Sequence, residues 1–352
     1  MIRTLIVDDS AFMRMAIRSM LASSPDIKIA GDACNGKKAV DKSKSLHPDI
    51  IIMDVNMPVM DGLTAVKTIM STDPVPIIMF STLTVEGSKE ALEALQLGAI
   101  DFVPKSESHH DVNKIEKELV DKIRNIHSSN PPSILRLINM RKFKGEVVRG
   151  KWSCAGDFAV LIGSSTGGPS SLEQVIPRLP GDLPAPVFVV QHMPEGNFCK
   201  QLAERLNFLS ELEVKEARNN EKVTAGVVYI APPGGYHMTV KKALGVTRIK
   251  LIKSQPVHAV MPAVDVIAES MLDVYGKNIV AAILTGMGFD GAAGFKKIRD
   301  AGGSTIACSE DTCVIFGMPK AAIAAGGIDT VKPIFEIPEE IVRMSEVKCN
   351  GK

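Results

Sequence analysis

Short apolar runs alternate with helix-length amphipathic segments along most of the chain, and this alternation limits the folds open to it. In the first 125 residues the apolar runs lie at 5–7, 50–53, 77–80 and 101–103. Segments long enough for helices lie between them, such as 11–21 and 86–97, the second of which is followed by Gly98. Near-continuous apolar strands separated by helices are typical of a parallel sheet covered on both faces. The sequence therefore predicts an α/β fold.

A second α/β series follows a stretch of different composition. Its apolar runs lie at 158–162, 187–190, 227–230 and 279–284. A chain of 352 residues is longer than a domain with a single hydrophobic core usually is, so we expect two domains, at 1–125 and 157–345. Residues 126–156 contain serine, proline, glycine and basic residues, which predicts a linker with at most a short helix at 134–140. The last residues, beyond about Val342, are expected to fray.

Composition argues against several classes of protein. The formal net charge is +1 and no basic stripe is present, so nucleic acid is not an expected partner. No apolar run approaches the ~20 residues of a membrane span, and the first residues do not resemble a signal peptide. The six cysteines lack zinc-type spacings and are interpreted as reduced thiols. We expect a cytoplasmic protein that does not insert into membranes.

Polar side chains stand at the ends of the strands predicted in the first domain. Asp8 and Asp9 follow the first strand and Asp54 follows a later one. Ser81 ends the next strand, and Lys105 follows the one after. The carboxyl ends of parallel strands meet at one edge of a sheet, which is where α/β folds bind ligands. We therefore expect these side chains to converge.

Such a cluster has the chemistry of a phosphate acceptor. Clustered carboxylates repel one another unless a cation joins them, and oxygen ligands suit Mg²⁺. Asp8 and Asp9 are the expected metal pair, and Asp54, alone at its strand end, is the expected nucleophile toward a phosphoryl group, with Mg²⁺ and Lys105 neutralising its charge. Ser81 would hydrogen-bond a phosphoryl oxygen. Each residue alone is better interpreted as a helix or turn cap, but five in this order favour a phosphorylation site.

Three stretches of the first domain match the motifs of a known family. The stretches VDDS (7–10), MDVNMPVMDG (53–62) and GAIDFVPK (98–105) are similar to the receiver domain of bacterial response regulators. The resemblance covers about the first 125 residues. It implies a flavodoxin-like five-stranded parallel fold and phosphotransfer from a histidine kinase to Asp54.

In the second series, GSSTGGP (163–169) follows an apolar strand and precedes a predicted helix. A glycine-rich turn of this kind collects backbone N–H groups and a helix N-terminus at one point. It could hold a phosphate, display Ser165 as a nucleophile, or be purely structural. The lysine of a phosphate-binding loop is absent, and neither the glycine spacing nor a matching acidic residue fits a dinucleotide site.

Two further strand ends favour the nucleophile. His192 directly follows 187–190, and Asp290 lies in TGMGFDG (285–291) after 279–284. Serine, imidazole and carboxylate from three strand ends can form a Ser–His–Asp triad, in which His192 deprotonates Ser165 and Asp290 orients the imidazole. The flexible glycines on either side of Met287 would let its amide approach an oxyanion.

GSSTGG, QHMP, TGMGFDGAAG and FGMPKAAI (316–323) resemble the catalytic domain of the chemotaxis receptor methylesterase, the CheB family. The resemblance spans about 157–345 and implies a second doubly wound α/β domain with a mostly parallel sheet. It implies that Ser165, not Ser164, is the nucleophile, that Met287 supplies an oxyanion N–H, and that Thr166 shapes the site. The implied substrates are glutamate γ-methyl esters on methyl-accepting chemoreceptors, and many members also deamidate receptor glutamines. A CheA-type histidine kinase is the implied phosphodonor, and ester hydrolysis itself is expected to need no cofactor.

One stretch departs from the family. Where the family often has His-Arg-Pro-Ser-Val-Asp, residues 260–265 are Val-Met-Pro-Ala-Val-Asp, so a basic contact to substrate is missing. His237 and His258 are expected to be structural or peripheral. A response regulator with a non-enzymatic output is the alternative, but a DNA-binding output should show a basic recognition helix, and none is apparent. An inactive scaffold should have lost at least one of Ser165, His192 and Asp290.

A switch and a hydrolase in one chain predict regulation. A hydrolase that is always active would leave the phosphorylation switch without an effect, so we expect the unphosphorylated receiver to cover the cleft at Ser165. The resemblance implies the same arrangement. Phosphorylation of Asp54 would then weaken this docking and shift the population toward an open enzyme.

Overall fold

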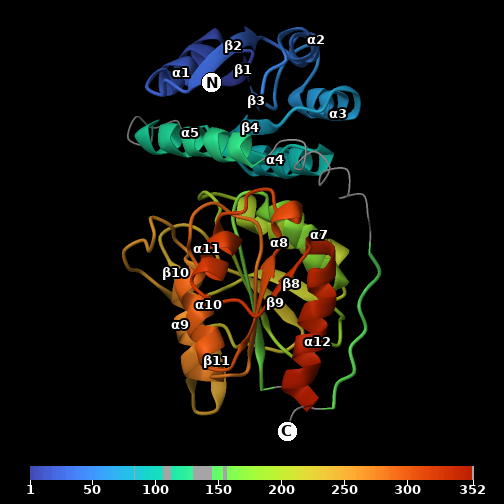
Figure 1. The fold of residues 1–352 in the computed structure, drawn as a ribbon, viewed down its shortest axis with the longest axis vertical. Helices are drawn as coiled ribbons and strands as arrows, with labels where there is room; N and C mark the ends of the chain where they lie inside the picture. Colours follow the sequence, from blue (N-terminus) through green and yellow to red (C-terminus); the bar gives the residue numbers. More distant parts are fainter. Residues whose placement is uncertain (83, 106–111, 130–144, 154–156, 351–352) are drawn as a thin grey trace. The chain divides into compact units, whose positions relative to one another are not determined.

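Two separate parallel sheets organise the chain, one in each of the units Met1–Lys142 and Phe143–Lys352 (Figure 1). The structure is a computed structural model that describes residues 1–352 except 83, 106–111, 130–144, 154–156 and 351–352. The short helix predicted at 134–140 lies outside the described residues.

The first sheet has five parallel strands in the order β2-β1-β3-β4-β5. This order is that of flavodoxin-like folds, so the predicted fold of the first domain is confirmed. The strands are β1 (Ile2–Val7), β2 (Ile27–Ala33), β3 (Ile50–Met53), β4 (Ile77–Ser81) and β5 (Asp101–Pro104). The helices are α1 (Ala11–Ala22), α2 (Gly36–Leu46), α3 (Gly62–Thr72), α4 (Val85–Leu97) and α5 (Val112–Ser128).

Local signals set these boundaries. Every residue of β3 and β4 is buried, as expected for strands covered by helices on both faces. The Ser10 side chain caps α1 by accepting a hydrogen bond from the Met13 amide, so α1 begins just beyond Asp8 and Asp9. Gly98 ends α4 with a φ of 120°, a conformation that side chains rarely adopt. Helices that begin so soon after strands leave the strand-end carboxylates at the sheet edge.

The second sheet has seven strands, all parallel, in the order β14-β13-β12-β6-β7-β9-β8. A separate antiparallel pair, β10 (His237–Ala243) and β11 (Val246–Ile252), completes a mostly parallel domain and confirms the predicted class. The sheet strands are β6 (Ala159–Ser164), β7 (Val187–Gln191), β8 (Glu213–Glu216), β9 (Val227–Ile230), β12 (Ile279–Ile283), β13 (Ser304–Cys308) and β14 (Thr330–Lys332). The helices are α7 (Gly168–Val175), α8 (Phe198–Leu209), α9 (Val264–Tyr275), α10 (Ala292–Asp300), α11 (Met318–Ala324) and α12 (Ile337–Asn350).

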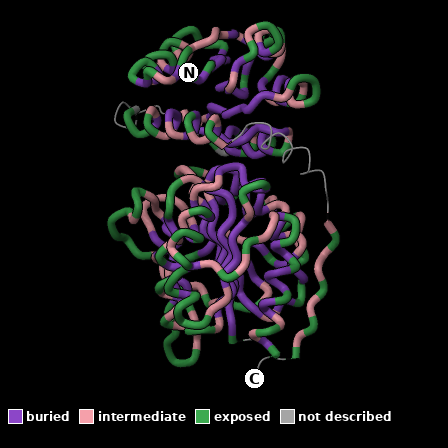
Figure 2. Tube along the Cα trace, in the orientation of Figure 1, coloured by how far each residue is buried: buried purple, intermediate pink, exposed green. Residues whose placement is uncertain are grey.

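The hydrophobic core of the C-terminal unit is built around the central strands of its sheet. Every residue of β6, β7 and β12 is buried, and Figure 2 shows the buried trace running through the middle of the unit. Helices α9 and α10 cover one face of the sheet, and α7 and α12 cover the other (Figure 1). The chain proceeds from β6 to β7 on one side, while β12 pairs with β6 on the other. The carboxyl end of β6 is therefore a topological switch point, where α/β sheets open a crevice.

The C-terminal end differs from expectation. Helix α12 continues to Asn350, and Cys349 is only 2% exposed, so the prediction of frayed residues after Val342 is wrong. Apolar side chains of α12 pack inward, and the described residues 145–153 also bond to it. For example, the Lys151 amide donates to Glu346 Oε1 at 2.7 Å. None of the helices formed by the described residues has the length and apolar character that crossing a bilayer requires.

Candidate functional site

The N-terminal unit carries an acidic pocket at the carboxyl edge of its sheet. Lys105 Nζ lies 2.9 Å from Asp8 Oδ2 and 2.8 Å from Asp54 Oδ2. Asp8 and Asp54 are almost fully buried, whereas Asp9 is exposed. One oxygen from each of the three carboxylates lies within 4.8 Å of the others. Four of the five residues predicted to converge are thus brought together.

This pocket is short of positive charge. Burial raises the pKa of Asp54, and neighbouring Asp8 adds to the rise. The Lys105 ammonium and the Val55 amide, which donates to Asp54 Oδ1 at 2.8 Å, oppose it without cancelling it. Among the described residues, Lys105 is the one side-chain cation that contacts these carboxylates, and it does not neutralise all three. A hard divalent cation with oxygen ligands would, so the residues fit Mg²⁺.

Ser81, the fifth predicted residue, makes a different contact. Its buried hydroxyl donates to the Gly87 carbonyl oxygen at 3.1 Å, near the start of α4. A side chain at position 87 would collide with Thr82, so the close approach of this turn requires glycine. In this state the Ser81 hydroxyl is bonded to α4 and not to the acidic pocket.

In the C-terminal unit, the three predicted triad residues follow three adjacent strands. Ser165 follows β6, His192 follows β7, and Asp290 lies in the loop after β12. His192 Nε2 lies 2.9 Å from Asp290 Oδ2. The His192 amide donates to the Ser164 carbonyl oxygen at 3.0 Å, which joins the first two strand ends.

Ser165 is partly buried beside this pair. Its amide donates to the Thr285 carbonyl oxygen at 3.0 Å, and a Cβ on Gly286 would lie 2.8 Å from Ser165 Cβ. Within the described part of the chain, the Ser165 hydroxyl makes no hydrogen bond to His192. Because Nε2 of His192 is bonded to Asp290, Nδ1 is the ring nitrogen left for Ser165.

The neighbouring serine has a different environment. Ser164 is fully buried, and its hydroxyl donates to Gln191 Oε1 at 2.7 Å. Gln191 Nε2 donates to the Ser165 carbonyl oxygen at 3.0 Å and to the His192 carbonyl oxygen at 2.8 Å. A side chain at Gly168 would collide with this amide. Gln191 therefore clamps the two strand ends together, a role that sequence analysis missed. A polar residue ending an apolar strand was the available signal.

Asp290 is held by a helix N-terminus that sequence analysis also missed. The Val264 amide donates to Asp290 Oδ2 at 2.7 Å, and the Asp265 amide donates to Oδ1 at 3.1 Å. The N-cap residue of α9, Ala263, has no side chain that could do this, so Asp290 caps the helix. Burial raises the pKa of Asp290, but the bonds from His192 and the two amides outweigh it and the net shift is downward.

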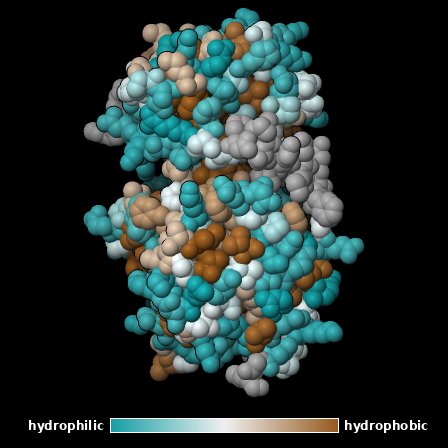
Figure 3. Space-filling model, viewed as in Figure 1, coloured by the Kyte–Doolittle hydropathy of each residue, from teal (hydrophilic) through white to brown (hydrophobic). Residues whose placement is uncertain are grey.

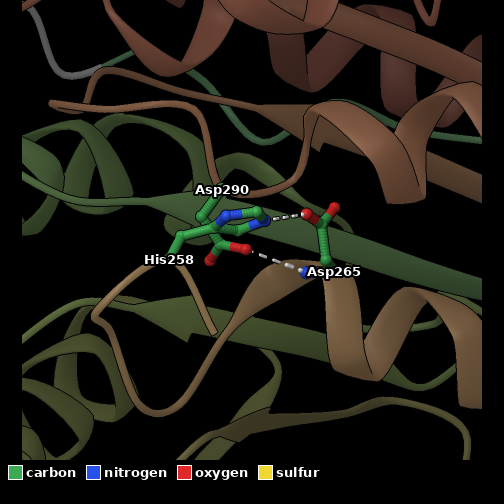
Figure 4. Close-up of side chains that lie close together, drawn as sticks. All are labelled: His258, Asp265 and Asp290. Atoms are coloured by element: carbon green, nitrogen blue, oxygen red, sulfur yellow. Dashed lines mark hydrogen bonds and ion pairs between the residues drawn. The ribbon is translucent and has the colours of Figure 1, made fainter. Parts of the chain in front are cut away.

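Figure 4 shows a second acidic residue beside Asp290. Asp265 Oδ2 lies 2.9 Å from His258 Nε2, and Asp265 Oδ1 accepts from the Gly294 amide at 2.6 Å. Burial and the nearby Asp290 raise the pKa of Asp265. His258, Asp265 and Asp290 are close enough to share a cation, but all four carboxylate oxygens already accept N–H bonds. The cluster is therefore a satisfied network that connects α9 to the Asp290 loop.

The other residues assigned to the site line the same turn. Thr166 is buried, and its carbonyl oxygen accepts from Thr285 Oγ1 at 3.0 Å. Gly167 has a φ of 74° and starts α7, so the positive end of that helix lies close to Ser165. Half-buried Met287 follows Gly286, whose carbonyl oxygen accepts from the Met318 amide at 2.9 Å. His237 is fully buried and accepts from the Ala263 amide at 3.0 Å, which fits the expected structural role.

Comparison with known proteins agrees with this geometry. The family model described as CheB methylesterase matches residues 160–341, and the response regulator receiver domain model matches residues 4–116. A curated relative from Methanosarcina mazei, named protein-glutamate methylesterase/protein-glutamine glutaminase 1, is 99% identical over 352 residues and covers 100% of this chain and 98% of its own. The chain belongs to the CheB methylesterase family.

More distant CheB relatives agree. A Thermotoga maritima protein-glutamate methylesterase/protein-glutamine glutaminase is 44% identical, with 97% of this chain and 98% of that protein covered. The crystal structure of the Thermotoga maritima CheB methylesterase catalytic domain is 47% identical, with a TM-score of 0.52, and covers 56% of this chain and 100% of that one. The predicted family, fold and methylesterase class are confirmed. The receiver domain indicates an enzyme that is regulated by phosphorylation. Phosphorylation of receiver domains usually depends on Mg²⁺.

Proposed function

We propose that this CheB-family chain hydrolyses glutamate γ-methyl esters on methyl-accepting chemoreceptors, and deamidates receptor glutamines, during chemotaxis adaptation in the cytoplasm. The observation that carries the proposal is the His192–Asp290 pair, 2.9 Å apart, beside partly buried Ser165. Asp290 is buried and held at the N-terminus of α9. An anion fixed in this way stabilises an imidazolium next to a hydroxyl, which is what an acyl-transfer triad requires.

In the proposed mechanism Ser165 Oγ attacks the ester carbonyl while His192 Nδ1 takes its proton. Asp290 stabilises the imidazolium and keeps its own charge, since its pKa lies below the usual value. The Met287 amide and the N-terminus of α7 stabilise the oxyanion. The proton on His192 passes to the leaving methoxide, and methanol departs from an acyl-Ser165 ester. Water, deprotonated by His192, hydrolyses that ester and regenerates Ser165; with a glutamine substrate the leaving molecule is ammonia.

Ser164 takes no part in this chemistry, because its hydroxyl is buried and bonded to Gln191. Thr166 shapes the turn through its carbonyl bond to Thr285. In this mechanism hydrolysis needs no cofactor, because serine, imidazole and carboxylate supply the nucleophile, the base and the charge that stabilises the imidazolium. Methanol release by unphosphorylated protein should therefore be insensitive to a chelator.

For regulation, Asp54 accepts a phosphoryl group from a CheA-type histidine kinase. Asp8, Asp9 and Asp54 would hold Mg²⁺, which supplies positive charge to the phosphoryl oxygens. Lys105 already lies between Asp8 and Asp54 and can contact the incoming group. To reach a phosphoryl oxygen, the Ser81 hydroxyl has to leave the Gly87 carbonyl oxygen. This exchange changes the start of α4 and couples phosphorylation to the receiver surface.

We propose that this surface, when unphosphorylated, covers Ser165 and blocks access of the substrate. In this proposal the receiver spans 1–125, the linker 126–156 and the esterase 157–345. Phosphorylation then shifts the population toward the open enzyme.

The decisive experiment incubates the intact protein with methylated receptor signalling fragments and measures methanol. Wild-type protein should release methanol. Ser165→Ala should lose several orders of magnitude in rate, and Ser164→Ala, the matched control, should lose far less. If Ser164→Ala abolishes turnover and Ser165→Ala does not, the nucleophile is misassigned. If wild-type protein releases no methanol, the chain has a non-enzymatic output.

A further inference from the structure

A large aromatic side chain lies exposed beside the triad. Phe289 is 57% exposed and stands between Gly288 and the buried Asp290. Gly288 has a φ of 85°, so the loop turns sharply just before the aromatic residue. Asp290 is directed into the unit toward His192, and the adjacent Phe289 remains accessible to solvent.

Exposure alone would not distinguish Phe289. Figure 3 shows several apolar patches on the visible face of the C-terminal unit, and Phe208 on α8 is 81% exposed. Scattered exposed apolar residues are normal on protein surfaces. What distinguishes Phe289 is that a second ring holds it.

That ring is His258. The two ring centroids lie 4.5 Å apart at an interplanar angle of 65°, an edge-to-face arrangement. His258 is in turn fixed by its 2.9 Å bond to Asp265 (Figure 4). His258 and Ala259 both have positive φ values, 55° and 62°. Non-glycine residues rarely adopt this conformation, and here the two residues form the tight turn between Val257 and Val260, whose backbones exchange two hydrogen bonds.

The surrounding stretch favours an apolar partner. Residues 257–265 contain no lysine or arginine, so neither of these cations contacts a substrate from this segment. A glutamate methyl ester side chain reaching Ser165 is too small to cover an aromatic ring as well. The segment of substrate protein that carries the ester has to pass the rim of the site, and a rigid aromatic residue there can bury apolar surface with little loss of entropy.

We propose that Phe289, held by His258, is a specificity-determining contact for the receptor, on which an apolar side chain near the ester-bearing glutamate packs. The proposal rests on the proposed function. It assigns recognition in this chain to an aromatic pair, at the rim where the basic residue of the family pattern is missing.

The test compares two substrates on the intact protein. One is the methylated receptor fragment, and the other is N-acetylglutamate γ-methyl ester, which has no neighbouring side chains. Phe289→Ala should lower kcat/KM on the receptor fragment about 5- to 30-fold, mainly through KM, and change the small-ester rate less than about twofold. Phe208→Ala, the matched control, should change neither. Phe289→Tyr should restore most of the receptor activity, and His258→Gln should raise KM on the receptor fragment by a smaller factor.

Other results would overturn the proposal. An equal loss on both substrates would mean that Phe289 only supports the Asp290 loop. A Phe289→Ala protein that hydrolyses the small ester much faster than wild type without phosphodonor would identify the protein's own receiver as the occupant. Activity that depends on protein concentration in wild type but not in Phe289→Ala would identify a second copy. Absence of turnover by wild type on both substrates would overturn the proposed function itself, and this contact with it.

Discussion

Asp54 and Asp290 are both buried carboxylates that follow strands of a parallel sheet, yet their pKa values move in opposite directions. Asp54 shares Lys105 with Asp8, accepts the Val55 amide, and its pKa is raised by burial. Asp290 accepts two amides of α9 as well as the His192 ring, and its pKa is lowered overall despite burial.

The position at a strand end therefore does not decide what a carboxylate does. The number of donors aimed at it does. Asp290 is a fixed anion suited to hold an imidazole without reacting. Asp54 lacks compensating charge, which suits a residue that takes up a cation and then a phosphoryl group.

The largest expected effect tests Asp290 as a fixed anion. Asp290→Asn should lower kcat for methanol release by about 10⁴-fold, because an amide cannot stabilise the imidazolium or hold the same ring tautomer. Asp300→Asn, in an exposed ion pair with Lys296, is the control and should leave the rate unchanged. A loss below about tenfold in Asp290→Asn would contradict the assigned role.

The next effect tests the receiver as an inhibitor. A fragment beginning near residue 145 keeps the bonded segment 145–153 and lacks Asp54. It should release methanol about 5- to 150-fold faster than the unphosphorylated intact chain, which corresponds to a docking bias of ~1–3 kcal/mol. It should also ignore phosphodonor. A fragment no faster than the intact chain would indicate a receiver that activates by contact or recruits the substrate.

A smaller effect tests the clamp between strand ends. Ser164→Ala leaves Gln191 Oε1 buried without its donor, so the free energy of unfolding should fall by about 1–3 kcal/mol. Denaturant titration of the C-terminal transition measures this. An unchanged stability would mean that the Ser164–Gln191 bond does not hold the turn.

The smallest effect concerns the sign of the two carboxylate shifts. Because the pKa of Asp54 is raised in the folded state, protonation stabilises the fold at low pH, and that stability is lost as pH rises through the folded pKa. Asp54→Asn should therefore raise the free energy of unfolding of the receiver at neutral pH by about 0.5–2 kcal/mol. This difference between variant and wild type should shrink in acid and with Mg²⁺.

Asp290 has the opposite sign. Its charged form contributes stability above the unfolded pKa, and this stability is lost as pH falls through the lower folded pKa, so Asp290→Asn should lower the free energy of unfolding at neutral pH. Thermal unfolding at several pH values measures the sign of both changes. Equal signs would show that the two carboxylates are not held in opposite electrostatic environments.

The sequence predicts the strand-end positions well, because alternating apolar and amphipathic segments locate where each strand stops. Asp8, Asp54, Ser165, His192 and Asp290 were all found in this way. The order of the strands cannot be predicted in this way, because the placement of β6 between β7 and β12 depends on how long crossover connections pack.

The supporting contacts could not be predicted for the same reason. The α9 amides that bind Asp290 come from residues 25 and 26 positions away in sequence, and no local pattern marks them. Ser81 was correctly placed at a strand end, but the direction of its hydroxyl toward Gly87 depends on how closely α4 packs. The prediction of frayed residues after Val342 is wrong because the burial of Cys349 depends on tertiary packing, which the local sequence does not show.

Receiver control of the Ser165 esterase is tested most directly by measuring methanol release from methylated receptor fragments. The intact protein is assayed with and without a small phosphodonor and Mg²⁺. Wild type should be activated about 5- to 150-fold and should carry an acid-stable, base-labile acyl phosphate. Asp54→Ala should carry no such label and should keep the unstimulated rate under both conditions. Label or activation retained undiminished in Asp54→Ala, or wild type labelled at Asp54 but not activated, would contradict a receiver that controls the Ser165 esterase through Asp54.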